Sequence, residues 1–311
     1  MTLTQLKYLL SVAEHGNFTL AAAKSFVTQP TLSMQIQKLE EELGVKIFNR
    51  NTKPIGLTAI GHTIVKQAKV ILQEAQRMED AVAQEKGSIA GSFRLGIIPT
   101  IMPTLLPMFL TNFIKKYPKV DLKIEEITTE NICQLIHKGQ LDAGIAATPL
   151  GKENILEKPL FYEPFVAYLP QNHHLLKQDS IAVEDLNHNN ILVLEDGHCF
   201  RDHVLNLCPT SNTTKGFGLK SGSFETLINL ANQGLGMTLL PYLHTLDLNE
   251  QQKRQLLNFP EPAPAREISV IHSKNQLKLP VIDALRNTIL GVVRGAIAFD
   301  NVQIIAPKIG R

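Results

Sequence analysis

Two cysteines close together in the sequence are the residues best suited to do chemistry. Cys199 and Cys208 lie at the two ends of a stretch of helical pattern, 200–207, which follows a turn and ends before Pro209. A cysteine at a helix N-terminus, with a histidine (His198) beside it, favours the thiolate, the nucleophilic form of the side chain. Nine residues of helix span roughly 13 Å, whereas the Cα atoms of a disulfide lie within about 7 Å. The two sulfur atoms therefore cannot bond to each other while this helix is intact.

Metal binding and inert burial are the other interpretations of these side chains. A metal site would use nearby groups whose spacing matches no standard zinc pattern: His198, Cys199, Asp202, His203 and Cys208. A lone cysteine is most often a small buried hydrophobe. Cys133, on an apolar face with Ile132 and Ile136, fits that description. We expect neither a bound metal nor a cofactor.

Composition indicates an ordinary globular protein with a basic N-terminal part. The 311 residues are 44% hydrophobic, enough for two or three domains, and three cysteines are too few for a disulfide scaffold. Residues 1–70 carry eight basic and four acidic side chains, a local charge of +4 within a chain of net charge +2. Local positive charge of this kind favours a polyanionic partner. The N-terminus lacks the apolar core of a signal peptide, so we expect a cytoplasmic protein with no membrane partner.

The N-terminal 58 residues have the pattern of a winged helix-turn-helix. Apolar residues at helical spacing predict helices from about Thr4 to His15, from Thr19 to Phe26, and from Pro30 to the stop at Gly44. Two helices joined by a short turn can place the second helix in the DNA major groove. The short runs 45–50 and 56–58 predict a β-hairpin wing. A plain three-helix bundle with a solvated polar face is the alternative.

We expect seven side chains in this part to contact DNA. Five lie on the polar face of the third helix and two lie in the wing, where they suit base edges, phosphates or the minor groove. They are Thr31, Ser33, Met34, Gln35 and Lys38 on the helix, and Arg50 and Lys53 in the wing.

Residues 59–90 predict one long helix followed by a hinge at 87–91. An apolar seam is sustained over about three heptads, and a single helix cannot bury it alone: Ile60, Ile64, Ala68, Ile71, Ala75, Met78 and Val82. We therefore expect at least a dimer that reads a palindromic site on double-stranded DNA. The alternative is that the seam packs against the rest of its own chain.

The remainder, 91–311, has the alternating strand and helix pattern of an α/β domain. A strand at 93–98, a helix at 105–117 and a strand at 120–124 form a βαβ unit, and further elements follow at 130–138, 143–146 and 165–169. The alternation of helix and strand repeats at 224–241, which suggests two lobes around a mainly parallel sheet. We expect one lobe to comprise 91–163 with 268–300, and the other 164–267.

This order of parts resembles the LysR-type transcriptional regulators along nearly the whole chain. The resemblance rests on AAAKSFVTQPTLSMQIQKLEEELGVKIFNR in residues 1–58, the head, and on LGIIPT and NQGLGMTLLP in residues 91–311, the body. It rests also on LEDGHCFRDHVLNLC, which is similar to the signature of the family's hydrogen-peroxide sensors. It implies a winged helix-turn-helix, a dimerising linker helix and a periplasmic-binding-protein-like sensor, assembled as a dimer or a dimer of dimers.

The same resemblance implies the roles of individual residues. Cys199 would be oxidised by peroxide and joined to Cys208 as a disulfide, which changes DNA contacts and transcription. Four residues resemble the family's peroxide pocket: Thr100, Thr129, His198 and Arg266. RNA polymerase and a thiol reductant, a glutaredoxin or thioredoxin, are the further partners implied. Phe200 stands where leucine is common, and Cys133 is additional.

Two other functions fit the same sequence. A LysR-type regulator could bind a small metabolite between the lobes, with both cysteines as bystanders. Alternatively, the body could be a thiol peroxidase, an enzyme, although the helix-turn-helix argues against it. A solute-binding module of a transporter would need an export signal. We therefore expect a regulator that is not an enzyme.

Overall fold

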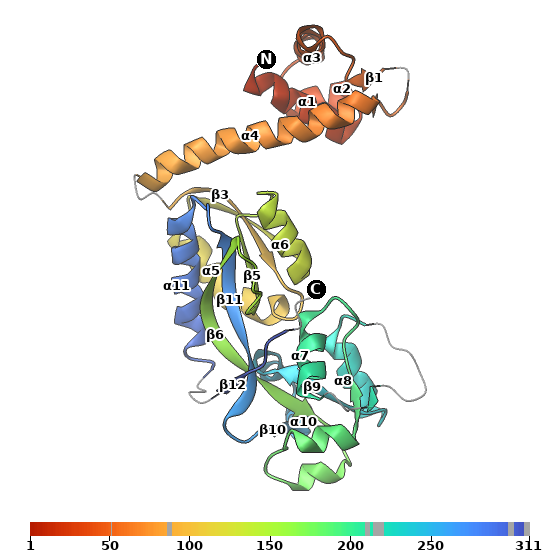
Figure 1. Ribbon diagram of the computed structural model, residues 1–311, viewed down its shortest axis with the longest axis vertical. Coiled ribbons are helices and arrows are strands. Elements are labelled where there is room, and N and C mark those ends of the chain that lie inside the picture. Colours follow the sequence, from red (N-terminus) through yellow and green to blue (C-terminus); the bar gives the residue numbers. More distant parts are fainter. Residues whose placement is uncertain (51, 86–88, 209–211, 214–220, 298–301, 308–311) are drawn as a thin grey trace. The chain divides into compact units, whose positions relative to one another are not determined.

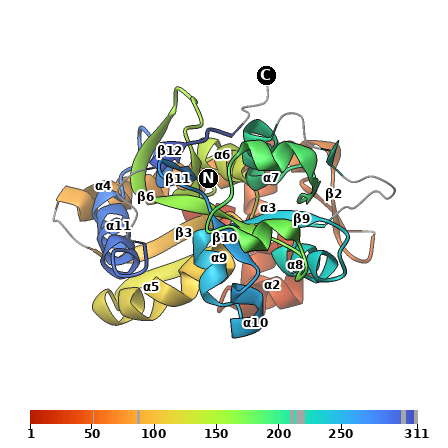
Figure 2. The ribbon, with the colours of Figure 1, turned by 90° about the horizontal axis from the view of Figure 1, so that it is seen from below.

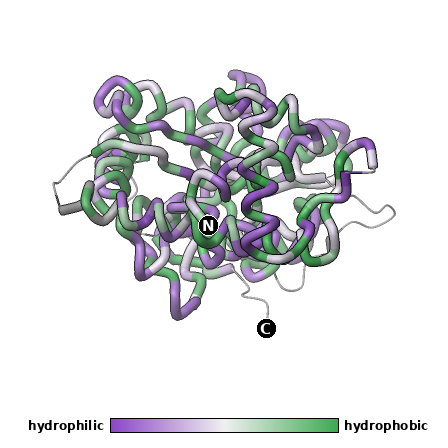
Figure 3. The backbone as a smooth tube through the Cα atoms, turned by 90° about the horizontal axis from the view of Figure 1, so that it is seen from above, coloured by the Kyte–Doolittle hydropathy of each residue, from purple (hydrophilic) through white to green (hydrophobic). Residues whose placement is uncertain are grey.

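The chain forms two units, Met1–Glu85 and Lys86–Arg311, which are described one at a time (Figure 1). The computed structural model describes residues 1–311 except 51, 86–88, 209–211, 214–220, 298–301 and 308–311. The expected hinge at 87–91 thus lies partly outside the described residues. No helix in the described ranges is long and apolar enough to span a membrane. Consistent with this, the tube in Figure 3 alternates between hydrophobic and hydrophilic colours along its length.

Three helices form the head as expected. They are α1 (Leu3–His15), α2 (Phe18–Lys24) and α3 (Gln29–Leu43). Each begins at a side-chain cap, supplied by Thr2, Asn17 and Thr28, and α1 and α3 end at glycines in the left-handed conformation. Their apolar stripes meet in one core, to which Leu9 and Ile36 contribute fully buried side chains. The second helix is shorter than expected, because the turn into α3 begins at Ser25.

The wing is a short antiparallel pair, β1 (Phe48–Asn49) with β2 (Gly56–Leu57). The expectation of a strand beginning at residue 45 is wrong. The reason is Glu40, whose buried carboxylate accepts hydrogen bonds from the backbone amides of Ile47 and Phe48, at 2.7 and 3.2 Å. The Val45 amide donates to the Glu40 carbonyl oxygen at 3.1 Å, so the chain is still leaving α3 at residue 45 and pairs as a strand only from Phe48.

The helix α4 (Ala59–Glu85) is about 40 Å long at 1.5 Å per residue. Its apolar seam divides into two parts. Ala68 is buried, and Ile64 is partly buried, against the core of the head. Farther along, Met78 and Val82 are 71% and 53% exposed. The expected seam is therefore partly covered within the unit, and its second half presents apolar side chains that the described residues of this unit leave exposed.

One sheet runs through the second unit, with ten strands among the described residues. Its strand order is β4-β3-β5-β11-β6-β9-β7-β8, with β10 beside β6 and β12 beside β11. The strands are β3 (Gly91–Ile97), β4 (Val120–Glu126), β5 (Ala143–Thr148), β6 (Ile155–Tyr168), β7 (Asn190–Leu192), β8 (Asn212–Thr213), β9 (Met237–Pro241), β10 (Leu256–Asn258), β11 (Ala263–Ser273) and β12 (Val302–Ile304).

The expectation of a mainly parallel sheet holds only for the outer strands. Parallel pairs join β3 to β4 and β5, and β7 to β8 and β9. The two central strands, β6 and β11, are antiparallel to each other and to their other long neighbours. These two strands run side by side through the unit in Figure 1. Both carry charged residues and prolines, so only the apolar run at 165–169, the end of β6, was recognised as a strand.

Helices cover the sheet around two hydrophobic cores. They are α5 (Met102–Lys116), α6 (Thr129–His137), α7 (Cys199–Leu207), α8 (Phe224–Asn232), α9 (Tyr242–Leu246), α10 (Glu250–Lys253) and α11 (Leu279–Val293), with 3-10 turns at His174–Lys177 and Glu184–His188. In Figures 1 and 2, α5 and α11 lie side by side. One core holds Phe93 and Phe109, and the other holds Phe165 and Phe200. The lobe boundaries given above remain a prediction.

Candidate functional site

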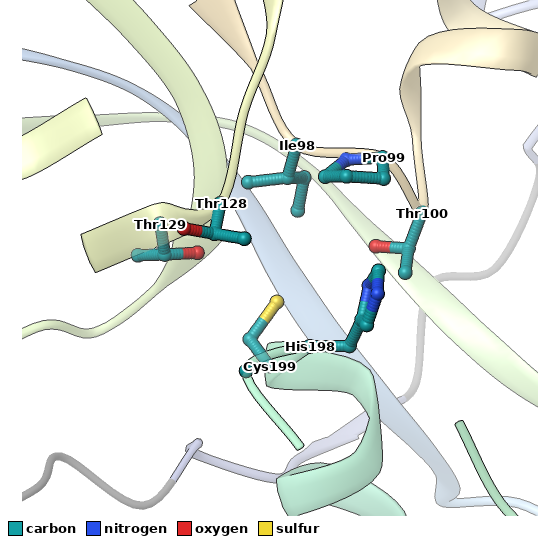
Figure 4. A pocket seen from close by; sticks show the side chains of 8 residues that line it. Ile98, Pro99, Thr100, Thr128, Thr129, His198 and Cys199 are labelled. Carbon is teal, nitrogen blue, oxygen red and sulfur yellow. The ribbon is translucent and has the colours of Figure 1, made fainter. Parts of the chain in front are cut away.

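A small pocket surrounds Cys199 at the carboxyl ends of two parallel strands. Thr100 lies in the turn after β3, and Thr129 is the first residue of α6, shortly after β4. Cys199 is the first residue of α7, preceded by His198 in an extended conformation. The pocket is tight and is lined by Ile98, Pro99, Thr100, Thr128, Thr129, Gly197, His198 and Cys199. Figure 4 shows the sulfur directed into the space between the Thr129 side chain and the residues Thr100 and His198.

The hydroxyl groups of the two threonines differ in their bonding. Thr100 Oγ1 accepts a hydrogen bond from Arg266 Nη1 at 2.8 Å, so its own proton is available for donation. Thr129 Oγ1 is buried, lies beside the Cys199 sulfur, and has no hydrogen bond of ordinary geometry within the described part of the chain. A buried hydroxyl without a partner is costly, and a polar ligand would remove that cost.

Arg266 lies behind the pocket and does not line it. Its guanidinium group donates to Glu163 through Nε at 2.9 Å and Nη2 at 2.8 Å, and to the Thr100 carbonyl through Nη2 at 3.1 Å. Arg266 and Glu163 are cross-strand partners on β11 and β6, and both side chains are 0% exposed. The second Glu163 oxygen accepts the Leu243 backbone N–H at the start of α9, at 3.0 Å. One buried ion pair thus connects the pocket to both central strands.

Burial dominates the electrostatics of Cys199. Burial raises the pKa of the Cys199 thiol, while the Arg266 guanidinium, the Thr129 hydroxyl and the Phe200 amide act in the opposite direction. Asp202 adds to the increase in pKa. The expectation that Arg266 and the helix N-terminus favour the thiolate is in line with these contributions, but the sequence did not show the larger effect of burial. The helix terminus and Arg266 do favour the thiolate, but not enough to offset desolvation.

The His198 side chain lines the pocket. That His198 favours the Cys199 thiolate stays a prediction. Its Nδ1 is buried and has no hydrogen-bond partner among the described residues. Its ring packs directly against Gly222, where an added Cβ would come within 2.7 Å of Nε2. Gly222 is thus required for this ring position, and no local sequence signal indicated it.

The helix α7 separates the two cysteines as expected. Cys208 caps its C-terminus, is 1% exposed, and donates its backbone N–H to the Val204 carbonyl at 2.9 Å. Burial raises the pKa of the Cys208 thiol to about 12. All three cysteines, including the buried Cys133, are free thiols. A nine-residue helix of roughly 13 Å between Cys199 and Cys208 agrees with this, since the two sulfurs are beyond bonding reach.

His203 is a buried residue of α7 that the sequence placed only among possible metal ligands. Its Nδ1 lies 2.6 Å from the Cys199 carbonyl oxygen, and its Nε2 has no hydrogen-bond partner among the described residues. Burial, with a smaller contribution from Arg266, lowers its pKa from 6.5 to about 3. The ring is therefore neutral at physiological pH. Across the described ranges, no group of three or more His, Cys, Asp or Glu side chains could hold a metal ion.

In the head, the candidate DNA-contacting residues lie on α3 and the wing. Thr31, Met34, Lys38 and Lys53 are exposed, and Ser33 and Gln35 are half-buried. The Gln35 side-chain oxygen accepts a hydrogen bond from Gln5 at 3.3 Å, which orients its amide. Arg50 lies 3.5 Å from the Glu40 carboxylate and over the ring of Phe18. The exposed residues Thr28 and Gln29, at the start of α3, are further candidates that the sequence reading missed.

Together, the fold and the site define a class: a DNA-binding regulator with a separate two-lobed α/β sensor that contains a cysteine pocket. Comparison with known families assigns the N-terminal part and the α/β part to the same family. Residues 3–62 match the bacterial regulatory helix-turn-helix protein, lysR family, and residues 86–294 match the LysR substrate binding domain. The chain belongs to the LysR family.

The similar proteins narrow the relationship further. A hydrogen peroxide-inducible genes activator of Pectobacterium carotovorum is 34% identical over 88% of this chain and 90% of its own length. The DNA-binding transcriptional dual regulator OxyR of Escherichia coli K12 is 33% identical over 88% of this chain and 89% of its own. Among solved structures, a full-length OxyR variant of Pseudomonas aeruginosa is 34% identical with a TM-score of 0.69, covering 93% of this chain and 98% of its own. A peroxide-bound OxyR mutant of Corynebacterium glutamicum is 27% identical with a TM-score of 0.65, covering 96% and 94%.

Proposed function

We propose that this protein is a peroxide-sensing transcription regulator. Hydrogen peroxide oxidises Cys199, a disulfide to Cys208 follows, and the resulting change in shape alters the contacts of the head with an operator. The observation that carries the proposal is the pair of threonine hydroxyls in the Cys199 pocket: that of Thr129 acts on the sulfur and has no hydrogen bond of ordinary geometry among the described residues, and that of Thr100 is held by Arg266. The relatives named as peroxide-inducible activators support it.

The first step is nucleophilic attack on peroxide. The Cys199 thiol loses its proton, the sulfur attacks one peroxide oxygen, and the O–O bond breaks. The departing hydroxide takes a proton and leaves as water, and Cys199 becomes a sulfenic acid. The hydroxyls of Thr129 and Thr100 donate hydrogen bonds to the peroxide oxygens, while Arg266 and the Phe200 amide stabilise the thiolate.

The second step joins the two cysteines. The Cys208 sulfur attacks the sulfenic sulfur, hydroxide is displaced and leaves as water with the Cys208 proton, and the disulfide forms. Because α7 separates the sulfurs, the helix must unwind or rearrange first. A thiol reductant such as a glutaredoxin or thioredoxin would reverse the step.

Pocket size argues against a metabolite beside Cys199. Ordinary small-molecule pockets measure about 300–1,000 Å³, whereas the Cys199 pocket is too tight to admit even a water-sized sphere in the resting protein. A larger hollow of about 470 Å³ is lined by Gln171, Gln251, Arg254 and Gln255, and includes none of the candidate site residues. Its lining lacks the apolar side chains typical of a metabolite site.

The exposed half of the α4 seam supports assembly. Met78 and Val82 are apolar and uncovered, as expected for a helix that pairs with its copy. We propose at least a dimer, which reads two halves of a palindromic operator on double-stranded DNA through α3 and the wing. RNA polymerase is the partner that a transcription activator of this kind would contact.

Peptide mass spectrometry after sub-stoichiometric peroxide, combined with a footprint on promoter DNA, tests the proposal. Wild-type protein is expected to form the Cys199–Cys208 disulfide and to change its footprint. Cys199→Ser should keep DNA binding without a peroxide response, and Cys133→Ser, the matched control, should behave as wild type. Fully reduced Cys199 in treated wild-type protein would overturn the proposal. Sustained peroxide turnover by the body without its head would instead favour a thiol peroxidase.

A further inference from the structure

The first turn of α7 is anchored by an aromatic cluster around Phe200. The Phe200 side chain is 2% exposed and packs edge-to-face against Phe165 on β6 at 5.3 Å and Phe224 on α8 at 5.0 Å, between ring centroids. The Arg266 guanidinium carbon lies 5.0 Å from the centre of the same ring. Phe200 therefore joins α7 to three other elements, and it directly follows Cys199 in the chain.

A second set of contacts holds the same turn from outside the core. Arg201 donates to the Leu194 carbonyl at 2.9 Å and forms an ion pair with Asp196 at 2.9 Å. Cys199 is thus followed directly by two anchored residues, Phe200 and Arg201. This arrangement keeps the sulfur in its pocket, where peroxide would meet it, and away from the Cys208 end of the helix.

We propose that Phe200 is a positioning residue that retains Cys199 in its pocket and slows the conversion of its sulfenic acid to the disulfide. The inference rests on the proposed function and concerns only its second step. In that step the Cys208 thiol displaces hydroxide from the Cys199 sulfenic sulfur, the S–S bond forms, and water leaves. The hydroxyl oxygen comes from the peroxide of the first step, so no other oxidant is required.

The consequence is a longer-lived sulfenic acid. Disulfide formation requires α7 to open, and the observed rate scales with the fraction of molecules in the open state. An aromatic pair or a cation–π contact is worth a factor of about two to ten in such an equilibrium. While the helix stays closed, a second peroxide molecule can oxidise the sulfenic acid to sulfinic acid. Phe200 thereby sets the balance between the reversible signal and irreversible oxidation.

The substitution Phe200→Leu removes the ring and keeps an apolar side chain. Arg266 keeps its bonds to Glu163 and Thr100, so the rate of Cys199 oxidation and its pH profile should stay within about twofold of wild type. Disulfide formation should accelerate about tenfold, and the sulfinic acid fraction at high peroxide should fall. A purely structural role for Phe200 would not separate the two steps in this way.

Rapid-quench kinetics on the full-length chain measure both steps, with dimedone trapping of the sulfenic acid and mass spectrometry of each sulfur species. Phe259→Leu is the matched control, because Phe259 is also buried in this core but makes none of these ring contacts. It should leave both rates unchanged. Phe224→Leu removes one contact from outside α7 and should accelerate only the second step, by a smaller factor.

Equal rates of disulfide formation in wild type, Phe200→Leu and Phe224→Leu would overturn the inference and leave the proposed function intact. The Phe224→Leu variant decides the question if Phe200→Leu does not fold. Absence of any Cys199 oxidation in wild-type protein would instead overturn the proposed function, so the two failures are distinguishable.

Discussion

Replacing Thr129 by valine should weaken the peroxide response while making the protein more stable. Valine keeps the shape of threonine and has a similar helix propensity, so the first turn of α6 is preserved. The substitution removes only the hydroxyl group. That hydroxyl is buried and has no ordinary hydrogen bond within the described residues, so nothing in the resting protein loses a bond.

The Thr129→Val substitution should raise the free energy of unfolding and lower the rate of Cys199 oxidation. A buried polar group without a partner costs about 1–3 kcal/mol, so its removal should raise the free energy of unfolding by about 1 kcal/mol. The peroxide transition state loses one hydrogen bond, worth about 1–2 kcal/mol, which corresponds to a decrease in the oxidation rate of about 5- to 30-fold.

Thr148→Val is the matched control on β5. The Thr148 hydroxyl bonds to Glu267 at 2.6 Å and to Ser269 at 2.6 Å, and it lies outside the Cys199 pocket. This substitution should lower the unfolding free energy by about 1–2 kcal/mol and leave the oxidation rate unchanged. Urea unfolding and peroxide stopped-flow kinetics measure the two quantities. A Thr129→Val protein that reacts at the wild-type rate would refute the role given to the unpartnered hydroxyl.

Three further predictions concern other parts of the molecule. Glu163→Gln leaves the buried Arg266 charge uncompensated and should lower the free energy of urea unfolding by about 3 kcal/mol. The double variant Glu163→Gln/Arg266→Met should restore part of that loss. Additive losses in the two single variants and the double variant would contradict the coupling. Burial lowers the pKa of His203 from 6.5 to about 3, so the contribution of the neutral ring to the free energy of unfolding is fully present above pH 6.5. It is lost as the pH falls, by about 2 kcal/mol at pH 5. A His203→Gln variant with the same pH dependence would exclude this cause. In sedimentation measurements, Met78→Glu on the exposed part of α4 should shift the protein toward monomer, whereas an unchanged assembly would remove α4 from the interface.

The local elements of the head and of α7 could be predicted because their signals are local. Thr28 and Pro30 mark the beginning of α3, Gly44 marks its end, and the apolar stripe lies between them. The pattern of 200–207 likewise gave α7, with a cysteine at each end. Such helices depend on residues within one or two turns, and the sequence displays those residues directly.

Apart from the apolar end of β6 at 165–169, the central strands could not be predicted, because the interactions that bury their charges join distant parts of the chain. Glu163 and Arg266 are separated by 103 positions, and each appears in the sequence as a charge that interrupts an apolar pattern. Only the folded sheet places them opposite each other, with both fully buried. The anchoring of Phe200 by Phe165 and Phe224 is a similar long-range effect. The sign of the Cys199 pKa shift also required the structure, since burial at the site outweighs the helix terminus.

Hydrogen exchange along α7, measured before and after one equivalent of peroxide, tests the central claim most directly. The account predicts that the amides of 200–207 are protected in the reduced protein and lose protection when the disulfide forms, because joining the sulfurs requires the helix to open. The amides of α8 should keep their protection and serve as the internal reference. A disulfide-bonded protein in which α7 stays as protected as in the reduced form would contradict the account.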